Sequence, residues 1–483
     1  MDVFGDSAQR DEPNAFVELL WERGSLFERE TVSALKMPFA DLSALKGDEK
    51  EAATRAAIAR GDALIYSGRL TVDSLLGEPD LLRREATAED GRALYVAIDI
   101  KSGAGEEGAS EGDDEDGKPK KTYGVQVALY TDILIQMGVS AGRHAFIWDV
   151  HGNEVRYELD MPLGPKTPDS MWSLYLEARR EVSDALAREG STRAASCSAC
   201  KMCVWRSACL RWLKEARDLT LLPELGRSRR NSLMAEFPTL EDLAGANVDR
   251  YIDGKKTQFA GVGPDMLRRF QARARLATTE NPAAYLKKEI AFPTAETELF
   301  FDIETDPLRD ICYLHGLVVR DRADNSTERF VAFFADGVTT AAERNAFAAA
   351  WGYIGAHPAA SIYIYSKYER TIYRKLAVKY PEVCSVADVD AVFAPSRTVD
   401  LYFDVVRPHT EWPTLDFSIK SVAKCLGFEW RDSHPSGAAS IQWFDEYVKS
   451  GAEQDKQRIL DYNEDDCRAM RVLVDGIRTM KVK

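Results

Sequence analysis

Residues 299–305 read LFFDIET, and this stretch decides how the second half of the chain folds. Its apolar residues predict a buried β-strand that begins at Glu298. Successive side chains of a strand point to opposite faces, so Asp302 and Glu304, two residues apart, share one face. Two carboxylates on one face of a buried strand are typical of metal-dependent catalysis.

Acidic residues further along the chain complete a candidate site. The apolar strand predicted for residues 361–365 leads into Glu369 at the head of a helix. Tyr462 and Asp466 are four residues apart on the last predicted helix, so they also share a face. Four carboxylates can hold two Mg²⁺ or Mn²⁺ ions for in-line attack by water, which Tyr462 would position. These carboxylates are Asp302, Glu304, Glu369 and Asp466.

This order of residues resembles the DEDD exonucleases of the RNase H-like fold, in the subtype that uses tyrosine. No histidine lies four or five residues before Asp466, which excludes the histidine subtype. Glu369 stands in place of the family's second aspartate, and its longer side chain alters the metal spacing. The resemblance implies an RNase H-like exonuclease domain over residues 291–483 that trims DNA from 3′ ends. Two further stretches support the same domain, residues 399–401 and 417–422.

The first half of the chain alternates helix and strand patterns, which predicts a mixed α/β domain over residues 1–216. The expected elements are a helix over residues 16–35, strands over 63–70 and 94–100, a helix over 124–137, and a hairpin over 144–159 that turns at Gly152-Asn153.

A second set of reactive residues lies on these elements. Asp99 and Lys101 are two apart on one strand and point to one face, and Asp80 can meet them from a neighbouring segment. Two carboxylates hold Mg²⁺, and the lysine can orient the attacking water or stabilise the charged phosphorane. Gln126 and Tyr130 are one helical turn apart and can face the same site. In chain order the set is Glu28, Asp80, Asp99, Lys101, Gln126 and Tyr130.

This set resembles the PD-(D/E)XK nucleases of the RecB type, in which G-x-P-D, D-x-K and Q-x-x-x-Y recur. The resemblance implies a restriction-endonuclease-like fold. Relatives carry a metal-binding histidine on the first helix, in a G-x-x-H-E pattern, but this chain has Phe27 there. Because phenylalanine cannot ligate a metal, Glu28 would serve alone. The replacement of this histidine by Phe27 weakens the expectation of nuclease activity but leaves the expected fold unchanged.

Four cysteines follow the first domain with the spacing C-x2-C-x2-C-x5-C, which indicates a metal site. Zinc prefers paired C-x2-C units well apart, and ferredoxin-type [4Fe–4S] runs have a similar but shorter spacing. The last three match the C-x2-C-x5-C of RecB-like iron–sulfur nucleases, which implies a [4Fe–4S] cluster; structural Zn²⁺ is the alternative. The fourth ligand is either the first cysteine or a residue on a helix preceding this chain. The four are Cys197, Cys200, Cys203 and Cys209.

The segment over residues 217–290 is expected to be helical and locally basic. Residues 211–276 contain thirteen basic and nine acidic side chains, although the whole chain has a formal charge of −15. A G-x-G turn at the start of a helix presents backbone N–H groups to an anion. With its flanking basic residues, this segment resembles a helix-hairpin-helix, which binds the DNA backbone. A solvated helical linker is the alternative. The candidate contacts are Lys255, Lys256, Gly261, Gly263, Arg268 and Arg269.

The charge and the apolar content of the whole chain limit its cellular location and its partners. An acidic chain with a pI near 5.1 is not expected to coat nucleic acid or a membrane surface. Residues 2–14 are polar and no window approaches the ~20 apolar residues of a membrane helix, so we expect a cytoplasmic protein. Residues 106–116 are expected to form a solvated acidic insertion. No phosphate-binding helicase motif is present, so unwinding would require a helicase or repair partner.

Together these patterns predict a multidomain α/β nuclease that acts on DNA. Single strands or 3′ ends are the expected substrates, and RNA is not excluded. The leading hypothesis gives both nuclease-type domains activity. In the second hypothesis only the C-terminal domain cuts, and the N-terminal domain holds DNA. A silent scaffold that delivers DNA to a partner is a third reading.

Overall fold

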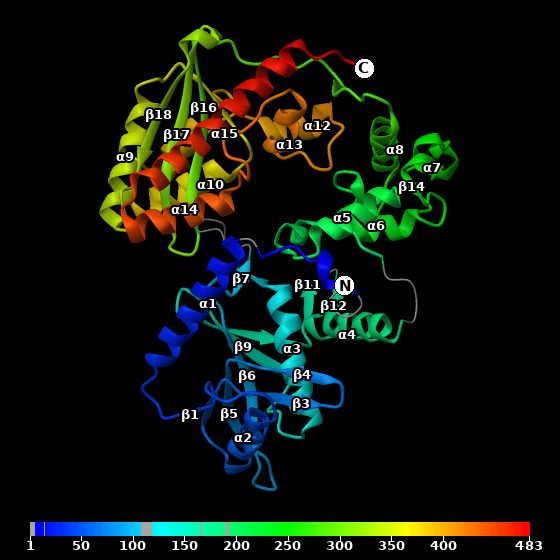
Figure 1. Cartoon of the computed structure of the whole chain (residues 1–483), viewed down its shortest axis with the longest axis vertical. Helices are drawn as coiled ribbons and strands as arrows, with labels where there is room; N and C mark the ends of the chain where they lie inside the picture. Colours follow the sequence, from blue (N-terminus) through cyan, green and yellow to red (C-terminus); the bar gives the residue numbers. More distant parts are fainter. Residues whose placement is uncertain (1–4, 14, 108–117, 165–166, 189–192) are drawn as a thin grey trace. The chain divides into compact units, whose positions relative to one another are not determined.

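The computed structural model describes residues 5–13, 15–107, 118–164, 167–188 and 193–483 (Figure 1). Most of the predicted acidic insertion lies outside these ranges, because residues 108–117 are not described. The chain divides into two compact units, Glu18–Thr192 and Met1–Val17 with Arg193–Lys483. The cysteine segment therefore belongs to the same unit as the C-terminal half. No helix in the described ranges combines the length and apolar character needed to cross a bilayer.

The unit Glu18–Thr192 contains a six-stranded mixed sheet. Its central strand β6 pairs antiparallel with β5 and parallel with β9, and β9 and β10 form a hairpin. In sheet order the strands are β1 (Ala40–Asp41), β2 (Leu64–Tyr66), β5 (Leu81–Thr87), β6 (Ala93–Ile100), β9 (His144–Trp148) and β10 (Glu154–Glu158). The helices are α1 (Ala15–Ser33), α2 (Gly47–Arg60), α3 (Lys121–Gln136) and α4 (Met171–Ala187).

The predicted elements of this unit are found with one change. The first helix, the strand at β6, the helix at α3 and the β9–β10 hairpin lie where the sequence placed them. The strand predicted over residues 63–70 is broken, because Ser67 has a positive φ of 57° that extended backbone cannot adopt. The chain resumes as a separate ribbon of β3 (Leu70–Val72) and β4 (Leu75–Gly77). Short pairs complete the unit: β7 (Glu106–Glu107) with β8 (Lys118–Pro119), and β11 (Pro162–Gly164) with β12 (Thr167–Ser170).

Short helices with their own apolar core follow the cysteine segment, as predicted. Leu219, Leu233, Phe237, Leu267 and Phe270 are all buried in that core. The elements are η2 (Ser198–Met202), α5 (Arg206–Glu215), η3 (Leu219–Leu221), α6 (Gly226–Leu233), α7 (Leu240–Gly245), η4 (Val248–Tyr251), the hairpin β13 (Ile252–Asp253) and β14 (Lys256–Thr257), and α8 (Pro264–Thr278).

The C-terminal part is a five-stranded sheet in the order β18-β17-β16-β19-β20. The long strand β16 pairs antiparallel with β17 and parallel with β19, and β19 pairs parallel with β20. The strands are β16 (Thr297–Asp306), β17 (Ile311–Asp321), β18 (Arg329–Phe334), β19 (Ser361–Ile364) and β20 (Thr398–Asp400). A small pair, β15 (Tyr285–Leu286) with β21 (Thr410–Glu411), lies outside this sheet.

Helices cover this sheet, and α15 runs across it (Figure 1). Leu299, Phe301 and Ile303 of β16 enter one apolar core, whereas Phe300 enters a second core together with residues of α15. This alternation turns Asp302 and Glu304 toward the α15 side, as the strand period requires. The helices are α9 (Thr340–Gly355), α10 (Tyr368–Lys379), α11 (Val386–Val392), the turn η6 (Leu401–Val406), α12 (Arg407–His409), α13 (Ile419–Cys425), α14 (Gly437–Ser450), α15 (Glu453–Thr479) and the short η5 (Asn325–Thr327).

The contact between β17 and α15 is unusually close at Gly316. A Cβ atom at this position would collide with the side-chain carboxamide of Asn463 and would meet the Phe330 ring at 3.0 Å. Asn463 is fully buried and donates through Nδ2 to Asp302 Oδ2 at 2.7 Å. The missing side chain of Gly316 therefore lets α15 approach the sheet closely enough to reach Asp302.

We expect Gly316→Ala to destabilise the C-terminal part by about 1–3 kcal/mol, because the added methyl overpacks this contact. Calorimetric unfolding would measure the change. Gly352→Ala is the matched control, since nothing lies near a Cβ there and α9 is helical, so it should stabilise by about 0.5–1 kcal/mol. Unfolding of Gly316→Ala at the wild-type temperature would contradict the close contact.

Candidate active site

Three carboxylates converge between β16 and α15. One ligand oxygen each of Asp302, Glu304 and Asp466 lies within 4.8 Å of the others. Asp302 and Glu304 come from one face of β16, and Asp466 comes from the middle of α15. Three oxygens at this separation form a donor set that suits a hard divalent cation such as Mg²⁺ or Mn²⁺.

Donor groups from α13 and from the segment that follows it contact Asp466. Lys420 of α13 donates through Nζ to both carboxylate oxygens of Asp466, each at 3.2 Å, and to the Tyr462 hydroxyl at 2.8 Å. The Trp430 indole N–H also donates to Asp466 Oδ1, at 2.7 Å. Lys420 therefore contacts both residues that the sequence predicted on the last helix, and its ammonium partly balances the local negative charge.

Glu369 approaches the same cluster from the first turn of α10. Its side chain is 3% exposed, and its Oε2 atom has no hydrogen-bond partner. Burial raises the pKa of Glu369 well above its ordinary value, and the negative charge of Asp302 raises it further. A buried carboxylate oxygen without a donor is costly, and a cation would satisfy it.

The pKa values of the β16 carboxylates are shifted in the same direction. Burial raises the pKa of Asp302 and of Glu304 well above the ordinary values, and repulsion within the cluster adds to both shifts. Lys420 and the hydrogen bonds from Asn463 and Ser440 act in the opposite direction. The cluster thus carries more negative charge than its neighbours neutralise, so its residues fit a divalent metal site.

Sequence reasoning missed the supporting residues Lys420, Trp430 and Asn463. Asn463 lies three residues before Asp466, so helical spacing could have suggested that both face the site. Lys420 lies in the stretch 417–422, which was recognised as part of the domain, but no spacing rule links it to a helix some forty residues later. Only the packing of α13 against α15 brings them together.

In the unit Glu18–Thr192, the predicted residues also lie near one another. Asp80 Oδ2 accepts from the backbone N–H of Ile100 at 2.6 Å, and Lys101 forms an ion pair with the buried Asp99. Burial raises the pKa of Asp80 to about 8, and the neighbouring charge of Asp99 contributes to this shift. Asp80, just before β5, therefore lies at the end of β6, where Asp99 and Lys101 are also found.

The remaining members of this set border the two aspartates. Gln126 Nε2 donates to the Tyr130 hydroxyl at 2.9 Å, one turn away on α3. Burial raises the pKa of Tyr130, and the charge of Asp99 adds to it. Glu28 of α1 hydrogen-bonds Tyr66, and burial together with this carboxylate raises the pKa of Tyr66 to about 12. Within the described residues, these carboxylates do not form a set of three with oxygens within 4.8 Å.

The four clustered cysteines are all free thiols. Cys197 and Cys200 have sulfur atoms 3.8 Å apart, and with Cys209 they line a cavity of about 670 Å³. Asp11 joins this segment to the start of the chain, because its N–H donates to the Val204 carbonyl and its carboxylate accepts from the Ser207 N–H. Three sulfur atoms within mutual ligand distance are not found in the described ranges.

The predicted nucleic-acid contacts lie on the β13–β14 hairpin, on the turn that follows it and on α8. Lys255 and Lys256 are exposed in the β13–β14 hairpin, and Gly263 caps the N-terminus of α8. Gly261 has a φ of 72°, a backbone conformation that glycine adopts readily. Arg268 pairs with Asp249 at 3.0 Å. Arg269 lies 3.8 Å from Glu224.

Arg273 of α8 has a different role from its basic neighbours. It is buried and donates through Nε to Glu411 Oε2 at 2.9 Å, and its guanidinium lies 4.8 Å from the centre of the Phe417 ring. Arg407 similarly pairs with Glu224 at 2.6 Å. These ion pairs fasten the short helices to the C-terminal part, so Arg273 is not available to a phosphate.

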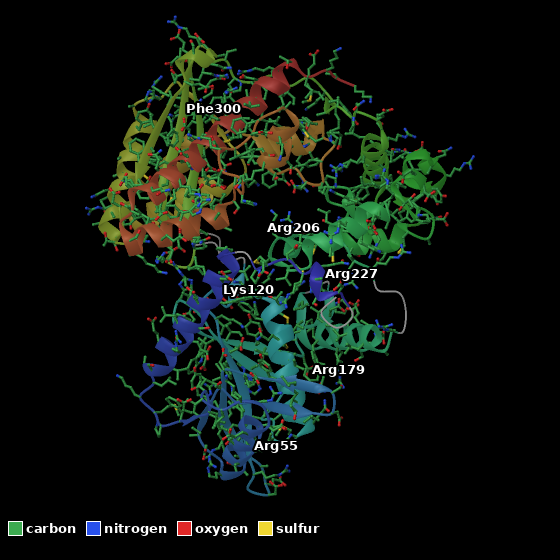
Figure 2. The ribbon with its side chains drawn as sticks, in the orientation of Figure 1. Arg55, Lys120, Arg179, Arg206, Arg227 and Phe300 are labelled. Carbon is green, nitrogen blue, oxygen red and sulfur yellow. The ribbon has the colours of Figure 1, made fainter. Side chains whose placement is uncertain are left out.

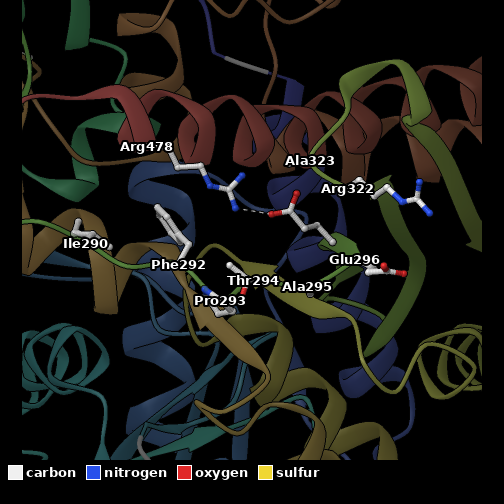
Figure 3. Close-up of a pocket in the computed structure, with 10 residues that line it drawn as sticks. Ile290, Phe292, Pro293, Thr294, Ala295, Glu296, Arg322, Ala323 and Arg478 are labelled. Atoms are coloured by element: carbon white, nitrogen blue, oxygen red, sulfur yellow. Dashed lines mark hydrogen bonds and ion pairs between the residues drawn. The ribbon is translucent and has the colours of Figure 1, made fainter.

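A second cavity, of about 630 Å³, lies beside the start of β16. Figure 3 shows Arg478 among the residues that line this cavity. Its guanidinium donates to Glu298 Oε1 at 2.7 Å. Glu298 also pairs with the fully buried Arg320 at 2.6 Å. Because Glu298 and Arg478 are paired, and Glu298 precedes Asp302 by four residues on β16, we assign these two residues a structural role.

The strand order, the carboxylates of β16 and the acidic face of α15 form an α/β domain with a carboxylate cluster that suits a divalent cation. In agreement, the family model of the RNase H superfamily matches residues 299–478. The C-terminal part is thus an RNase H-like domain within a mixed α/β multidomain protein, and this domain indicates a nuclease-type function. Comparisons with curated proteins and with solved structures give no match.

We expect Asp302→Asn to raise the melting temperature in chelator by a few degrees, because it removes one mutually repelling charge. Burial and repulsion raise the folded-state pKa of Asp302 above its ordinary value of 3.8, so stability falls as the pH rises above that value, and the gain from Asp302→Asn should grow in the same direction. Mn²⁺ should stabilise the wild type and have little effect on the variant. Calorimetry with and without Mn²⁺ would measure both effects.

The exposed Glu382 provides the matched control. Glu382→Gln should leave both the chelator stability and the Mn²⁺ response at wild-type values. Equal Mn²⁺ stabilisation of the wild type and Asp302→Asn would contradict a metal site at this carboxylate.

Proposed function

We propose that the protein is a metal-dependent nuclease whose C-terminal domain hydrolyses phosphodiester bonds of DNA from 3′ ends. The observation that carries this proposal is the convergence of Asp302, Glu304 and Asp466 on an RNase H-like sheet. The 3′ polarity and the tyrosine-type chemistry rest on the resemblance to DEDD exonucleases. Bound Mg²⁺ or Mn²⁺ would activate water and stabilise the charge that develops on the phosphate.

The chain's own residues have separable tasks in this reaction. Asp302, Glu304 and Asp466 hold the cations, and Glu369 supplies a further carboxylate from α10. Tyr462 presents its hydroxyl beside this cluster, where it can orient the attacking water. Lys420 fixes that hydroxyl and the Asp466 carboxylate in one geometry.

For the unit Glu18–Thr192, we propose a second nuclease site of the PD-(D/E)XK type. The pairing of β5 and β6 supports it, because it sets Asp80 beside Asp99 and Lys101. Bound metal would be held by these aspartates with Glu28, and Lys101 would orient the water. A second candidate is a DNA-holding domain without activity, which the replacement of the expected histidine by Phe27 favours.

The short helices and the cysteine segment are proposed to serve these sites. Lys255, Lys256, Gly261 and Gly263 would hold a phosphate backbone, since they are exposed and precede or cap the N-terminus of α8. The clustered thiols would hold a [4Fe–4S] cluster, or Zn²⁺ as the alternative. Unwinding of duplex substrates would come from a helicase or repair partner.

The activity is tested on end-labelled single- and double-stranded DNA, with RNA in parallel, in Mg²⁺ or Mn²⁺. Asp302→Ala should slow stepwise 3′ shortening by more than about 100-fold, because a metal ligand is lost. Asp99→Ala should remove a different product if both sites cut. Replacing Lys255 and Lys256 together with alanine should weaken DNA binding and flatten its salt dependence.

Glu382→Gln should cut like the wild type in these assays. Unchanged cleavage in Asp99→Ala would favour the DNA-holding role for the N-terminal unit. Cleavage that survives both Asp302→Ala and chelator, or no cleavage with either metal, would contradict the nuclease proposal.

The cysteine site is tested by metal analysis of protein purified without oxygen. We expect about four irons and four sulfides per chain for a [4Fe–4S] cluster, and one zinc for the alternative. Replacing Cys200 and Cys203 together with serine should remove the metal. Cys425→Ser, which changes an exposed cysteine outside the cluster, should keep it. A wild-type protein without iron or zinc would contradict a metal site.

A further inference from the structure

Exposed aromatic side chains lie beside the carboxylate cluster, where the nuclease reaction does not require them. Tyr368 is 46% exposed and immediately precedes Glu369, and Phe403 is 36% exposed on the turn η6. Lys367 is exposed, and its ammonium lies 5.0 Å from the centre of the Phe403 ring. We call Lys367, Tyr368, Tyr402 and Phe403 the aromatic patch.

Asp400 ties the aromatic patch to the carboxylate cluster. Its Oδ1 atom accepts the backbone N–H groups of Tyr402 and Phe403, both at 2.9 Å, and so caps the start of η6. Asp400 also accepts a hydrogen bond from the backbone of Ser366. The same carboxylate lies close enough to Glu369 to raise its pKa. The patch and Glu369 are therefore built on the segments that follow β19 and β20.

The backbone at this junction is held in an unusual conformation. Ser366 has a φ of 113°, which non-glycine residues rarely adopt. This turn separates β19 from α10 and directs Lys367 and Tyr368 outward while Glu369 stays buried. Tyr368 is further fixed by a 2.6 Å hydrogen bond between its hydroxyl and that of Thr305, next to Glu304. A residue in such a conformation needs support from its surroundings, and residues of this kind occur mostly at functional sites.

The patch continues into the cavity that the cysteine segment lines. The Tyr402 ring contacts Phe403 at 4.8 Å and forms part of the cavity wall, together with Tyr365, Ser366 and Phe417. Lys201 and Arg206 also line this cavity; Figure 2 marks Arg206 at the start of α5. At about 670 Å³ the cavity is within the ~300–1,000 Å³ typical of ligand sites.

From this arrangement we propose that the aromatic patch binds unpaired bases, so that the substrate of the C-terminal site is a single strand or a single-stranded 3′ end. The inference rests on the proposed nuclease function. Aromatic rings interleaved with cations bind single strands by stacking and charge, whereas the bases of a duplex stack on one another and cannot use such rings. Lys367, with Lys201 and Arg206 beyond it, would follow the phosphates. The turn η6 also carries an acidic side chain, Asp404, whose Oδ2 atom accepts the backbone N–H of Asp400 at 3.3 Å.

Binding is measured separately from cleavage by using the full chain with Asp302→Asn. The probes are a fluorescent single-stranded DNA oligonucleotide, the corresponding duplex, and a duplex with a single-stranded 3′ overhang, each followed by anisotropy in Mg²⁺. The parent should prefer the single strand and the overhang over the blunt duplex. Adding Phe403→Ala should weaken single-strand binding roughly 5- to 100-fold, the range expected for one lost base–ring stack.

Two pairs of variants separate a contact from a folding defect. Phe403→Trp keeps an aromatic face and should bind like the parent, whereas Phe403→Ala should not. Lys367→Ala should weaken binding and reduce the slope of the salt dependence by about one. Lys375→Ala, which removes an exposed lysine further along α10, should change neither.

The outcomes distinguish the two levels of the proposal. If the parent binds none of the probes, the proposed function itself is overturned, and the aromatic patch with it. If the parent binds single strands but Phe403→Ala and Lys367→Ala bind equally well, only the aromatic patch is overturned, and its exposed rings would then face another occupant, such as a protein. A preference for blunt duplex would also overturn it.

Discussion

Repulsion among buried carboxylates is the constraint on which the C-terminal part depends. Asp302, Glu304 and Asp466 have oxygens within 4.8 Å of one another, and Glu369 adds its charge from α10. Such a cluster is unfavourable without compensation. The fold supplies Lys420 and the donors on α15 and after α13, and it leaves the rest of the charge for a cation. The packing of α13, α15 and β16 therefore serves electrostatics as much as apolar burial.

The two units meet this constraint in different ways. In the unit Glu18–Thr192, Lys101 already pairs with Asp99, and burial holds the pKa of Asp80 near 8. The site in this unit contains fewer close carboxylates than the C-terminal site, and the ammonium group of Lys101 neutralises part of their charge. In the C-terminal site, one ammonium faces a larger number of acids. The difference is consistent with a stronger requirement for bound metal in the RNase H-like domain.

Much of the C-terminal architecture could be predicted because it depends on short periods in the sequence. The LFFDIET strand and the spacing of Tyr462 and Asp466 placed the acids on the correct faces. Lys420 and the aromatic turn at Tyr402 and Phe403 could not be found this way, because they reach the site through packing between distant segments. The break near Ser67 was also missed. The sequence pattern of this segment suits a strand and gives no sign of the positive φ at Ser67 that interrupts it.

The close approach of Gly316 to Asn463 has an evolutionary consequence. The two positions lie on different elements and are 147 residues apart, yet neither can change freely while the other remains. A side chain at position 316 would require a smaller residue at 463, which would in turn remove the donor to Asp302. Among descendants of this chain, the two residues should therefore be inherited together, and joint substitution of both positions should mark lineages in which Asp302 has lost this donor.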